Sequence, residues 1–261
     1  MDYQTIKVTK EQGVATILLN RPEKMNAVNE EMMKELVAAT EELGSDETVK
    51  VVVVTGVGRG FCAGGDLSSP MYQSTNPADI RKCIIGFGKI PLNLRNMPKP
   101  VIAAVNGAAT GAGLGFALAA DIIIASENAR FGHIYTNIGL MSDAGAIYFL
   151  PRLIGVSKAC EIIFTGKVID AKEAERIGLI SQVVPADQLE SVTREFAIKL
   201  AKRPAVAVGL AKISLYQGLA MDLPTAIEWE ARGHALSALT EDVKEGISAF
   251  MEKREPVFKG R

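Results

Sequence analysis

The chain has 261 residues, of which 48% are hydrophobic and 23% are charged, and its formal net charge is −1. This composition indicates a large core without a basic face, so neither nucleic acid nor a membrane is expected as a partner. Two histidines and three widely spaced cysteines argue against a metal site, and unpaired cysteines favour a reducing, cytoplasmic environment.

The first half of the chain alternates predicted strands and helices. Strands are predicted at residues 5–10, 14–19, 50–55, 101–105 and 121–125. The third contains four consecutive valines, a pattern typical of a strand buried on both faces. Helices are predicted at residues 30–43 after Asn29 as cap, at 79–96, and after a glycine-rich turn that ends at Gly115. This order predicts a mostly parallel sheet and an α/β fold.

The second half is predicted to be mainly helical. Helices are expected at residues 143–150, ending at Pro151, at 157–165, and from the capping box at Asp170 to a stop at Gly178. A last strand is expected at residues 179–184, followed by helices with breaks near Pro204, 218–224 and 240–241. We therefore divide the chain into a core at residues 1–195 and a helical region at residues 196–261.

Two glycine-rich loops, residues 59–66 and 107–115, each follow a predicted strand. Two such loops can direct backbone N–H groups at one oxygen, which describes an oxyanion hole. Taken singly, each loop is better explained as a tight turn that needs glycine. A dinucleotide site is disfavoured, because Phe116 stands where the third glycine of that motif is expected.

Together, these loops and further motifs resemble the crotonase superfamily, also called the enoyl-CoA hydratase/isomerase superfamily. The resemblance covers nearly the whole chain. In the first half it lies in the segments Arg21-Pro-Glu-Lys-Met-Asn-Ala27, Gly60-Phe-Cys-Ala-Gly-Gly-Asp66, Asn106-Gly107, Gly111-Ala-Gly113, Ala120-Asp121 and Arg130-Phe-Gly132. In the second half it continues through Thr165-Gly166, residues 174–179 and Glu245-Gly-Ile-Ser-Ala-Phe250. It implies a spiral of ββα units, followed by C-terminal helices that assemble homotrimers, often paired into hexamers.

The resemblance also implies an acyl-CoA thioester as ligand, with no metal or redox cofactor. The thioester oxygen would lie between the backbone N–H groups of Ala63 and Ala112. The remaining residues implied in substrate or coenzyme A binding are Lys24, Ala27, Gly65, Asp66, Leu67, Tyr135 and Phe258. Of these, Phe258 would contact the coenzyme A of a neighbouring subunit, whereas Asp66 by itself is more simply explained as a turn residue than as a base.

Two positions depart from the hydratases of this family, which place a glutamate at each. Here the residues are Gly115 and Tyr135, and neither can exchange a proton as a carboxylate does. Hydration through a pair of carboxylates is therefore disfavoured. The absence of a side chain at Gly115 is expected to leave room beside the acyl chain.

One carboxylate remains close in sequence, Asp143, in the segment Gly139-Leu-Met-Ser-Asp-Ala-Gly145. This segment resembles the isomerase branch, including the ring-epoxide CoA isomerases of phenylacetate degradation. In that branch the matching aspartate moves a proton within the bound acyl group. An alternative is that Asp143 only caps the helix that follows. We favour the catalytic role, and His133 is a further candidate for lining the acyl pocket.

These observations predict an isomerase that shifts a double bond between the β,γ and α,β positions of an acyl-CoA, with fatty acid metabolism or phenylacetate degradation as its setting. One alternative is a hydratase or decarboxylase that uses Tyr135 or a bound water. Another is a non-catalytic subunit that only binds CoA thioesters.

Overall fold

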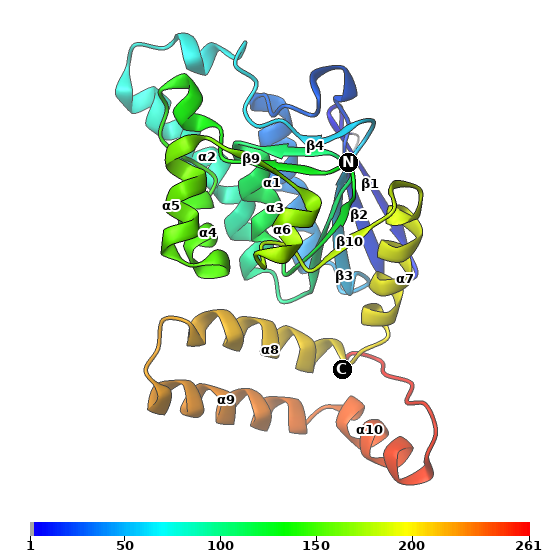
Figure 1. The fold of residues 1–261 in the computed structure, drawn as a ribbon. Helices are drawn as coiled ribbons and strands as arrows, with labels where there is room; N and C mark the ends of the chain where they lie inside the picture. The colour runs from blue at the N-terminus through cyan, green and yellow to red at the C-terminus, as the bar shows by residue number, and fades with distance from the viewer. Residues whose placement is uncertain (1–2) are drawn as a thin grey trace.

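A six-stranded, mostly parallel sheet forms the centre of the molecule (Figure 1). The computed structural model describes residues 3–261. In spatial order the strands are β1 (Ile6–Glu11), β2 (Val14–Leu19), β3 (Val51–Gly56), β5 (Val101–Val105), β7 (Ile122–Ser126) and β10 (Gln182–Val184). Only β1 and β2 pair in antiparallel fashion, as a hairpin. The predicted hairpin and the predicted parallel arrangement are both confirmed.

A second, smaller sheet was not predicted from the sequence. It consists of β4 (Gly60–Cys62), β6 (Ala108–Thr110), β8 (Arg130–Gly132) and β9 (Val168–Asp170). Each strand has three residues, too few to show an alternating pattern. Because β4, β6 and β8 each follow a strand of the large sheet, the chain climbs in successive ββα units, and the predicted crotonase-like spiral is confirmed.

Helices cover both faces of the large sheet. On one face lie α1 (Glu30–Ser45), α2 (Pro77–Asn96) and α3 (Ala112–Ala119), and on the other lies α7 (Leu189–Ala201). The valine run shows why both faces are apolar: Val52 and Val54 pack in the core of the first face, and Val51 and Val53 pack beneath α7. The strand is therefore buried on both faces, as predicted.

After β8 the chain forms three further helices, α4 (Ala146–Ile154), α5 (Val156–Thr165) and α6 (Ala171–Arg176). The cap predicted at Asp170 is confirmed, since its side chain accepts a hydrogen bond from the N–H of Glu173 at 2.8 Å. The predicted end of a helix at Pro151 is wrong. Pro151 lies inside α4, which continues until Gly155 adopts a positive φ of 76°. Residues 3–261 also contain four short 3-10 turns: η1 (Pro22–Lys24), η2 (Pro70–Gln73), η3 (Tyr135–Ile138) and η4 (Ala186–Gln188).

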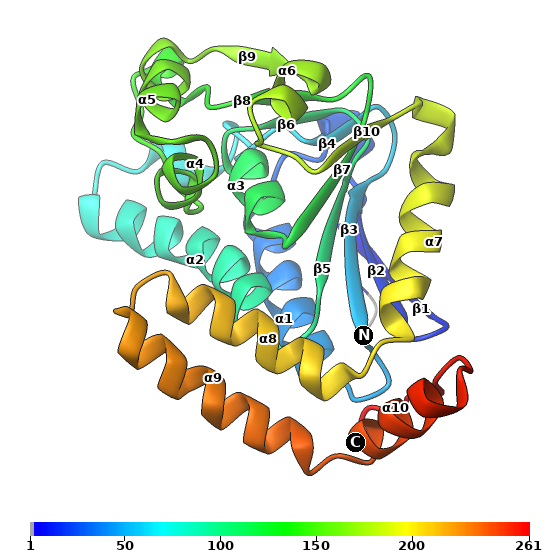
Figure 2. The ribbon, with the colours of Figure 1, turned by 60° about the horizontal axis from the view of Figure 1, so that its bottom comes forward.

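The C-terminal helices α8 (Ala205–Gly218), α9 (Leu223–Ala238) and α10 (Glu241–Glu252) lie at one end of the core (Figure 1). In Figure 2, α8 and α9 run side by side below α2, with α10 beyond them. The predicted helix breaks are confirmed, but the boundary at residue 195 falls inside α7. Since Ala197 of α7 is buried against the sheet, the structural change comes instead at Pro204.

A buried ion pair joins α8 to the core. The Nζ atom of Lys212 lies 2.8 Å from the carboxylate of Asp121 and also donates to the carbonyl groups of Leu94 and Lys99. The hydroxyl of Tyr216, one turn further along α8, donates to the same carboxylate at 2.8 Å. Burial lowers the pKa of Lys212, and the charge of Asp121 opposes that shift. Within residues 3–261, none of the helices is both long and apolar enough to cross a membrane.

Candidate active site

The first glycine-rich turn, residues 60–66, positions one free backbone donor. The N–H of Ala63 donates to the carbonyl of Met25 at 3.0 Å, which contradicts the predicted use of Ala63 as a free donor. Gly65 follows Ala63 by two positions. The neighbours of Gly65 on either side pair with Val28, whose carbonyl accepts from the N–H of Asp66 and whose N–H donates to the carbonyl of Gly64. Along the part of the chain that the structure describes, no backbone carbonyl accepts from the N–H of Gly65. Gly65 therefore replaces Ala63 as the available donor.

Asp66 closes this turn in a structural role. Its carboxylate accepts from the hydroxyl of Ser68 at 2.6 Å and forms an ion pair with Arg21 at 2.9 Å. The Ser68 hydroxyl, together with Arg21, lowers the pKa of Asp66. A carboxylate that is held ionised in this way is a poor proton acceptor, which agrees with the interpretation of Asp66 as a turn residue.

The second turn places a free donor at the start of a buried helix. Gly111 precedes α3 with a positive φ of 54°, which glycine adopts most readily. Ala112 is the first residue of α3, where the N–H groups of a helix are unpaired and the local potential is positive. The two turns are in contact, because a Cβ atom added at Gly64 would lie 3.5 Å from the nitrogen of Ala112.

Gly115 does not leave open space, contrary to the expectation from the sequence. A Cβ atom at this position would lie 2.4 Å from the carbonyl oxygen of Ala144 and 2.8 Å from its Cβ atom. The backbone after Asp143 therefore occupies the region that a side chain at position 115 would enter. A glutamate at this position cannot be accommodated unless the loop moves.

Asp143 lies in this loop as a half-buried carboxylate. The alternative prediction, that its side chain caps the following helix, is wrong: α4 begins at Ala146, its N-cap residue is Gly145, and that cap has no side-chain hydrogen bond. The side chain of Asp143 instead accepts a hydrogen bond from the hydroxyl of Tyr135. Burial raises the pKa of Asp143, and the Tyr135 hydrogen bond partly offsets this effect.

Tyr135 supports this carboxylate from η3. Its side chain is only 6% exposed, and its ring packs over Gly111 of the second turn. Burial and the charge of Asp143 raise the pKa of Tyr135 far above its ordinary value, so the phenol stays protonated and acts as a donor. The ring of His133 lies next to the Tyr135 ring, with 5.0 Å between the two ring centroids. Burial lowers the pKa of His133, which favours its neutral form.

Sequence reasoning missed Tyr72, which lies in η2 after the first turn. A Cβ atom added at Gly65 would be 2.4 Å from the hydroxyl oxygen of Tyr72. The charge of Asp143 contributes to the raised pKa of Tyr72, which also places these two groups in one neighbourhood. No motif in the surrounding loop distinguishes Tyr72, so no signal in the sequence pointed to it.

The other predicted binding residues separate into two groups. Lys24 is exposed in η1, Ala27 is half-buried and Leu67 is 57% exposed. Leu67 directly follows the first turn, whereas Lys24 and Ala27 belong to the segment whose residues Met25 and Val28 hydrogen-bond to that turn. Phe258 is not brought to the same place: Figure 1 shows the C-terminal segment at the lower end of the molecule and the loop after Asp66 at its upper end. A contact between Phe258 and the coenzyme A of a neighbouring subunit stays a prediction.

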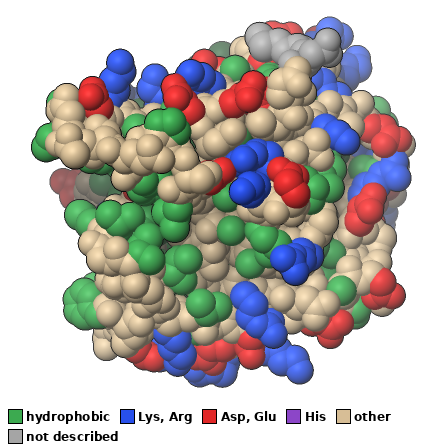
Figure 3. Space-filling view, turned by 90° about the horizontal axis from the view of Figure 1, so that it is seen from above, with side chains coloured by type: hydrophobic (Ala, Val, Ile, Leu, Met, Phe, Trp, Pro, Cys, Tyr) green, Lys and Arg blue, Asp and Glu red, His purple; other side chains and the backbone are tan. Residues whose placement is uncertain are grey.

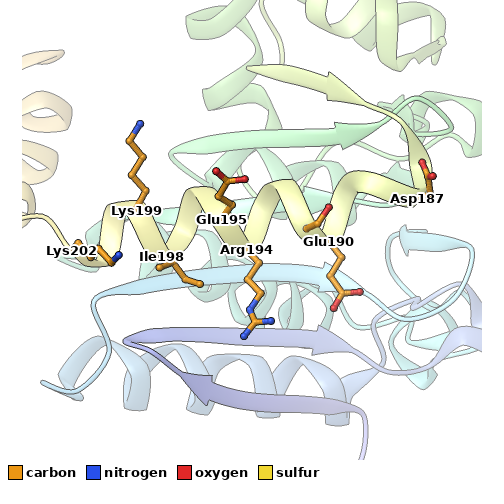
Figure 4. Close-up of a pocket in the computed structure, with 8 residues that line it drawn as sticks. Asp187, Glu190, Arg194, Glu195, Ile198, Lys199 and Lys202 are labelled. Carbon is orange, nitrogen blue, oxygen red and sulfur yellow. The ribbon is translucent and has the colours of Figure 1, made fainter.

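Two further features mark the surface. A shallow hollow along α7 is lined by residues of both charges, among them Arg194 (Figure 4). The guanidinium of Arg194 pairs with Glu11 at 2.9 Å. The face seen in Figure 3, which is the upper end of the molecule in Figure 1, gathers hydrophobic side chains on its left half, while charged side chains lie both near its centre and at its margins. Residues 3–261 contain no group of three or more His, Cys, Asp or Glu side chains arranged to hold a metal ion.

The chain is similar to known proteins over nearly its whole length. Residues 9–261 match the family model described as Enoyl-CoA hydratase/isomerase. The chain belongs to this family. It is 37% identical over 253 residues to the 1,2-epoxyphenylacetyl-CoA isomerase of Escherichia coli, covering 96% of the chain and 97% of that protein.

Two further relatives are named as hydratases. The chain is 38% identical over 256 residues to the short-chain-enoyl-CoA hydratase of Clostridium acetobutylicum, covering 98% of the chain and 97% of that protein. The crystal structure of an enoyl-CoA hydratase from Bacillus anthracis superposes with a TM-score of 0.95 at 36% identity, covering 99% of this chain and all of that one. The family and the fold are thereby established, and so is an enzyme of the hydratase/isomerase class.

Proposed function

We propose that this enzyme is an acyl-CoA isomerase, with Asp143 as its single proton carrier. The surroundings of positions 115 and 135, at which the hydratases of this family place glutamates, carry the proposal. Position 115 is closed by the backbone of Ala144, and position 135 holds a tyrosine whose hydroxyl is hydrogen-bonded to Asp143. One carboxylate suffices for isomerisation, because the same group can remove a proton and return it elsewhere.

The proposed reaction begins with a 3-enoyl thioester whose oxygen faces the two turns. Asp143 removes a proton from the α-carbon, and the electron pair delocalises into the thioester carbonyl and the double bond to give a dienolate. The backbone N–H groups of Gly65 and Ala112 stabilise its oxygen. Asp143 then returns the proton to the γ-carbon, which leaves the double bond between the α- and β-carbons.

For the remainder of the substrate, we place coenzyme A along the first turn. A surface hollow next to Asp66 offers room for a polar group. Its lining carries both charges and hydroxyl groups, from Arg21, Lys34, Glu30, Glu31, Asp66, Ser68 and Ser69. In this arrangement the adenine rests on the backbone of residues 65–67, and Lys24 contacts a phosphate. The chemistry requires no metal or redox cofactor.

The decisive test supplies the purified enzyme with 3-enoyl-CoA and follows the formation of the conjugated product by its absorbance. Replacing the carboxylate in Asp143→Asn should lower kcat by about 10²–10⁴-fold, since that is the usual contribution of a general acid–base group. Binding of coenzyme A, measured by calorimetry, should remain. Asp187→Asn, an exposed aspartate on η4, is the matched control and should retain full activity.

Two outcomes would contradict the proposal. Isomerisation by Asp143→Asn at the wild-type rate would remove Asp143 from the mechanism. Binding of the substrate without turnover by the wild type would instead support a non-catalytic subunit.

Hydration is the second candidate, because the C. acetobutylicum and B. anthracis relatives are named as hydratases. In that case the Tyr135–Asp143 pair would orient the attacking water. The test is the loss of 2-enoyl-CoA absorbance as water adds across the double bond. Hydration faster than isomerisation would favour the second candidate over the first.

We also propose that the chain assembles as a homotrimer, alone or paired into hexamers. Large apolar side chains are exposed at the end of α9 and on α10, among them Leu239, which directly follows α9, and Phe250, each 82% exposed. Exposed apolar surface of this kind marks interaction sites. Phe250→Glu should shift the native mass towards the monomer, measured by light scattering. An unchanged mass would show that α10 does not take part in assembly.

A further inference from the structure

Each of the two glycine turns is overlaid by a tyrosine. Tyr135 packs over Gly111, where an added Cβ atom would lie 3.9 Å from its hydroxyl oxygen. Tyr72 approaches Gly65 more closely and with its hydroxyl end, since the corresponding Cβ position is only 2.4 Å from its oxygen and 3.5 Å from the ring carbon Cζ. Tyr135 is already paired with Asp143, so the two tyrosines have different roles.

The contact between Tyr72 and Gly65 is made by a polar group. If Tyr72 only packed against the turn, its ring would be expected to meet Gly65 and its hydroxyl would point elsewhere. The hydroxyl instead lies over the residue whose N–H is free of any backbone carbonyl among residues 3–261. A Cβ atom on residue 65 would collide with this oxygen, so glycine at position 65 permits the approach.

The phenol of Tyr72 has the protonation state that a donor requires. Burial and the nearby charge of Asp143 raise the pKa of Tyr72 to about 12. The group is therefore neutral at physiological pH and carries its proton. A phenol in this position can donate a hydrogen bond to an oxygen that develops negative charge, and it does not add a second negative charge beside Asp143.

We propose that Tyr72 is a catalytic residue that donates a third hydrogen bond to the thioester oxygen, next to the backbone donor of Gly65. This inference rests on the proposed function only in placing the thioester oxygen between Gly65 and Ala112. The interaction strengthens as the oxygen becomes an enolate, because a hydrogen bond to a charged acceptor is stronger than one to a neutral carbonyl. Tyr72 thus lowers the barrier for any reaction at this site that passes through an enolate.

The test uses acetoacetyl-CoA, whose enolate has its own near-ultraviolet absorption band. Binding to an oxyanion site lowers the apparent pKa at which this ligand ionises, and a pH titration of the band measures the effect. Tyr72→Phe removes only the hydroxyl and should raise that apparent pKa by about one unit, a tenfold loss of enolate stabilisation. The kcat for 3-enoyl-CoA should fall by about 10–100-fold, somewhat less than for loss of a backbone oxyanion donor.

Tyr148→Phe is the matched control, because Tyr148 is half-exposed on α4 and lies over Arg152, not over either turn. It should leave both readouts unchanged. Gly65→Ala provides an independent variant, since its methyl group displaces the Tyr72 hydroxyl. In the background of Tyr72→Phe, the added cost of Gly65→Ala should be smaller than in the wild type.

The outcomes separate this inference from the proposed function. If Tyr72→Phe leaves both kcat and the ionisation constant of bound acetoacetyl-CoA within about twofold of the wild type, Tyr72 is not a donor, although the oxyanion site stands. If the wild type itself does not lower the apparent pKa of acetoacetyl-CoA, the oxyanion site is wrong and Tyr72 falls with it. If the enolate is stabilised but 3-enoyl-CoA is not isomerised, the Tyr72 inference survives and the isomerase proposal fails.

Discussion

Helices α3 and α9 stand at opposite extremes of burial. All eight residues of α3 are buried, whereas none of the sixteen residues of α9 is. The first helix is enclosed by its own chain and holds the donor N–H of Ala112 in a dry, rigid setting. The second exposes apolar side chains such as Leu223 and Ile227. The core is therefore complete within one chain, whereas α9 leaves its apolar side chains uncovered.

The comparison predicts that one substitution, glycine to alanine, has opposite effects in the two helices. In α3, a Cβ atom at Gly113 would lie 2.2 Å from the carbonyl oxygen of Cys62. Because the obstacle is backbone, the cost of Gly113→Ala should reach or exceed the upper end of the usual range for overpacking, about 3 kcal/mol. Urea denaturation measures it, and an unfolding free energy equal to that of the wild type would contradict this account of α3.

The connection between the two regions is tested by Lys212→Met. Removing one partner of a buried ion pair typically costs about 3–5 kcal/mol. The lower end is expected here, because Asp121 would still accept from the N–H of Val101 and from Tyr216. The same denaturation experiment applies. Arg232→Met, which breaks an exposed pair with Glu228 on α9, is the control and should change stability by less than about 1 kcal/mol.

Within the core, the proposed catalytic carboxylate should reduce stability. Burial raises the folded-state pKa of Asp143, so the folded protein binds this proton more tightly than the unfolded chain does. The resulting stabilisation is present at pH below the unfolded pKa and is lost as the pH rises through the folded pKa. At pH 8 the free energy of unfolding of Asp143→Asn, measured by urea denaturation, should therefore exceed that of the wild type by about 0.5–2 kcal/mol. This difference should vanish in acid. A variant less stable at pH 8 would contradict the shift.

The smallest effect is expected for Gly233→Ala in α9. A Cβ atom there has only one neighbour within 4 Å, the hydroxyl of Ser214 at 3.7 Å, which is an ordinary contact. Alanine should stabilise the helix by about 0.5–1 kcal/mol, because it loses less backbone entropy than glycine on folding. Thermal unfolding of this variant beside Gly113→Ala gives the comparison directly, and destabilisation by Gly233→Ala would show that α9 is more tightly packed than it looks.

Much of the fold was predictable because it follows from local patterns. The caps at Asn29 and Asp170 need only a short polar side chain before a helix, and both accept the expected backbone hydrogen bond. The buried strand was predictable because consecutive valines make both of its faces apolar. Pro151 misled the prediction, because a proline ends a helix only where the surrounding contacts permit. Here α4 continues past it and packs Phe149 and Leu150 in the core.

The site was predictable in part. The two turns and Asp143 are visible in the sequence, but the direction of each N–H is not. The N–H of Ala63 meets the carbonyl of Met25, which comes from a distant segment, whereas the N–H of Gly65 meets no backbone carbonyl among residues 3–261. The neighbour of Gly115 is likewise a backbone atom almost thirty positions later in the chain. Such contacts depend on tertiary structure, which residue types alone do not specify.

The contact between Gly115 and Ala144 also constrains how this enzyme can evolve. A single substitution that introduces glutamate at position 115 meets the carbonyl and the Cβ atom of Ala144. Ala144 itself has a positive φ of 50°, so the loop is held in a conformation that few side chains adopt. The two positions are therefore epistatic: a glutamate can enter position 115 only after the loop has been rebuilt.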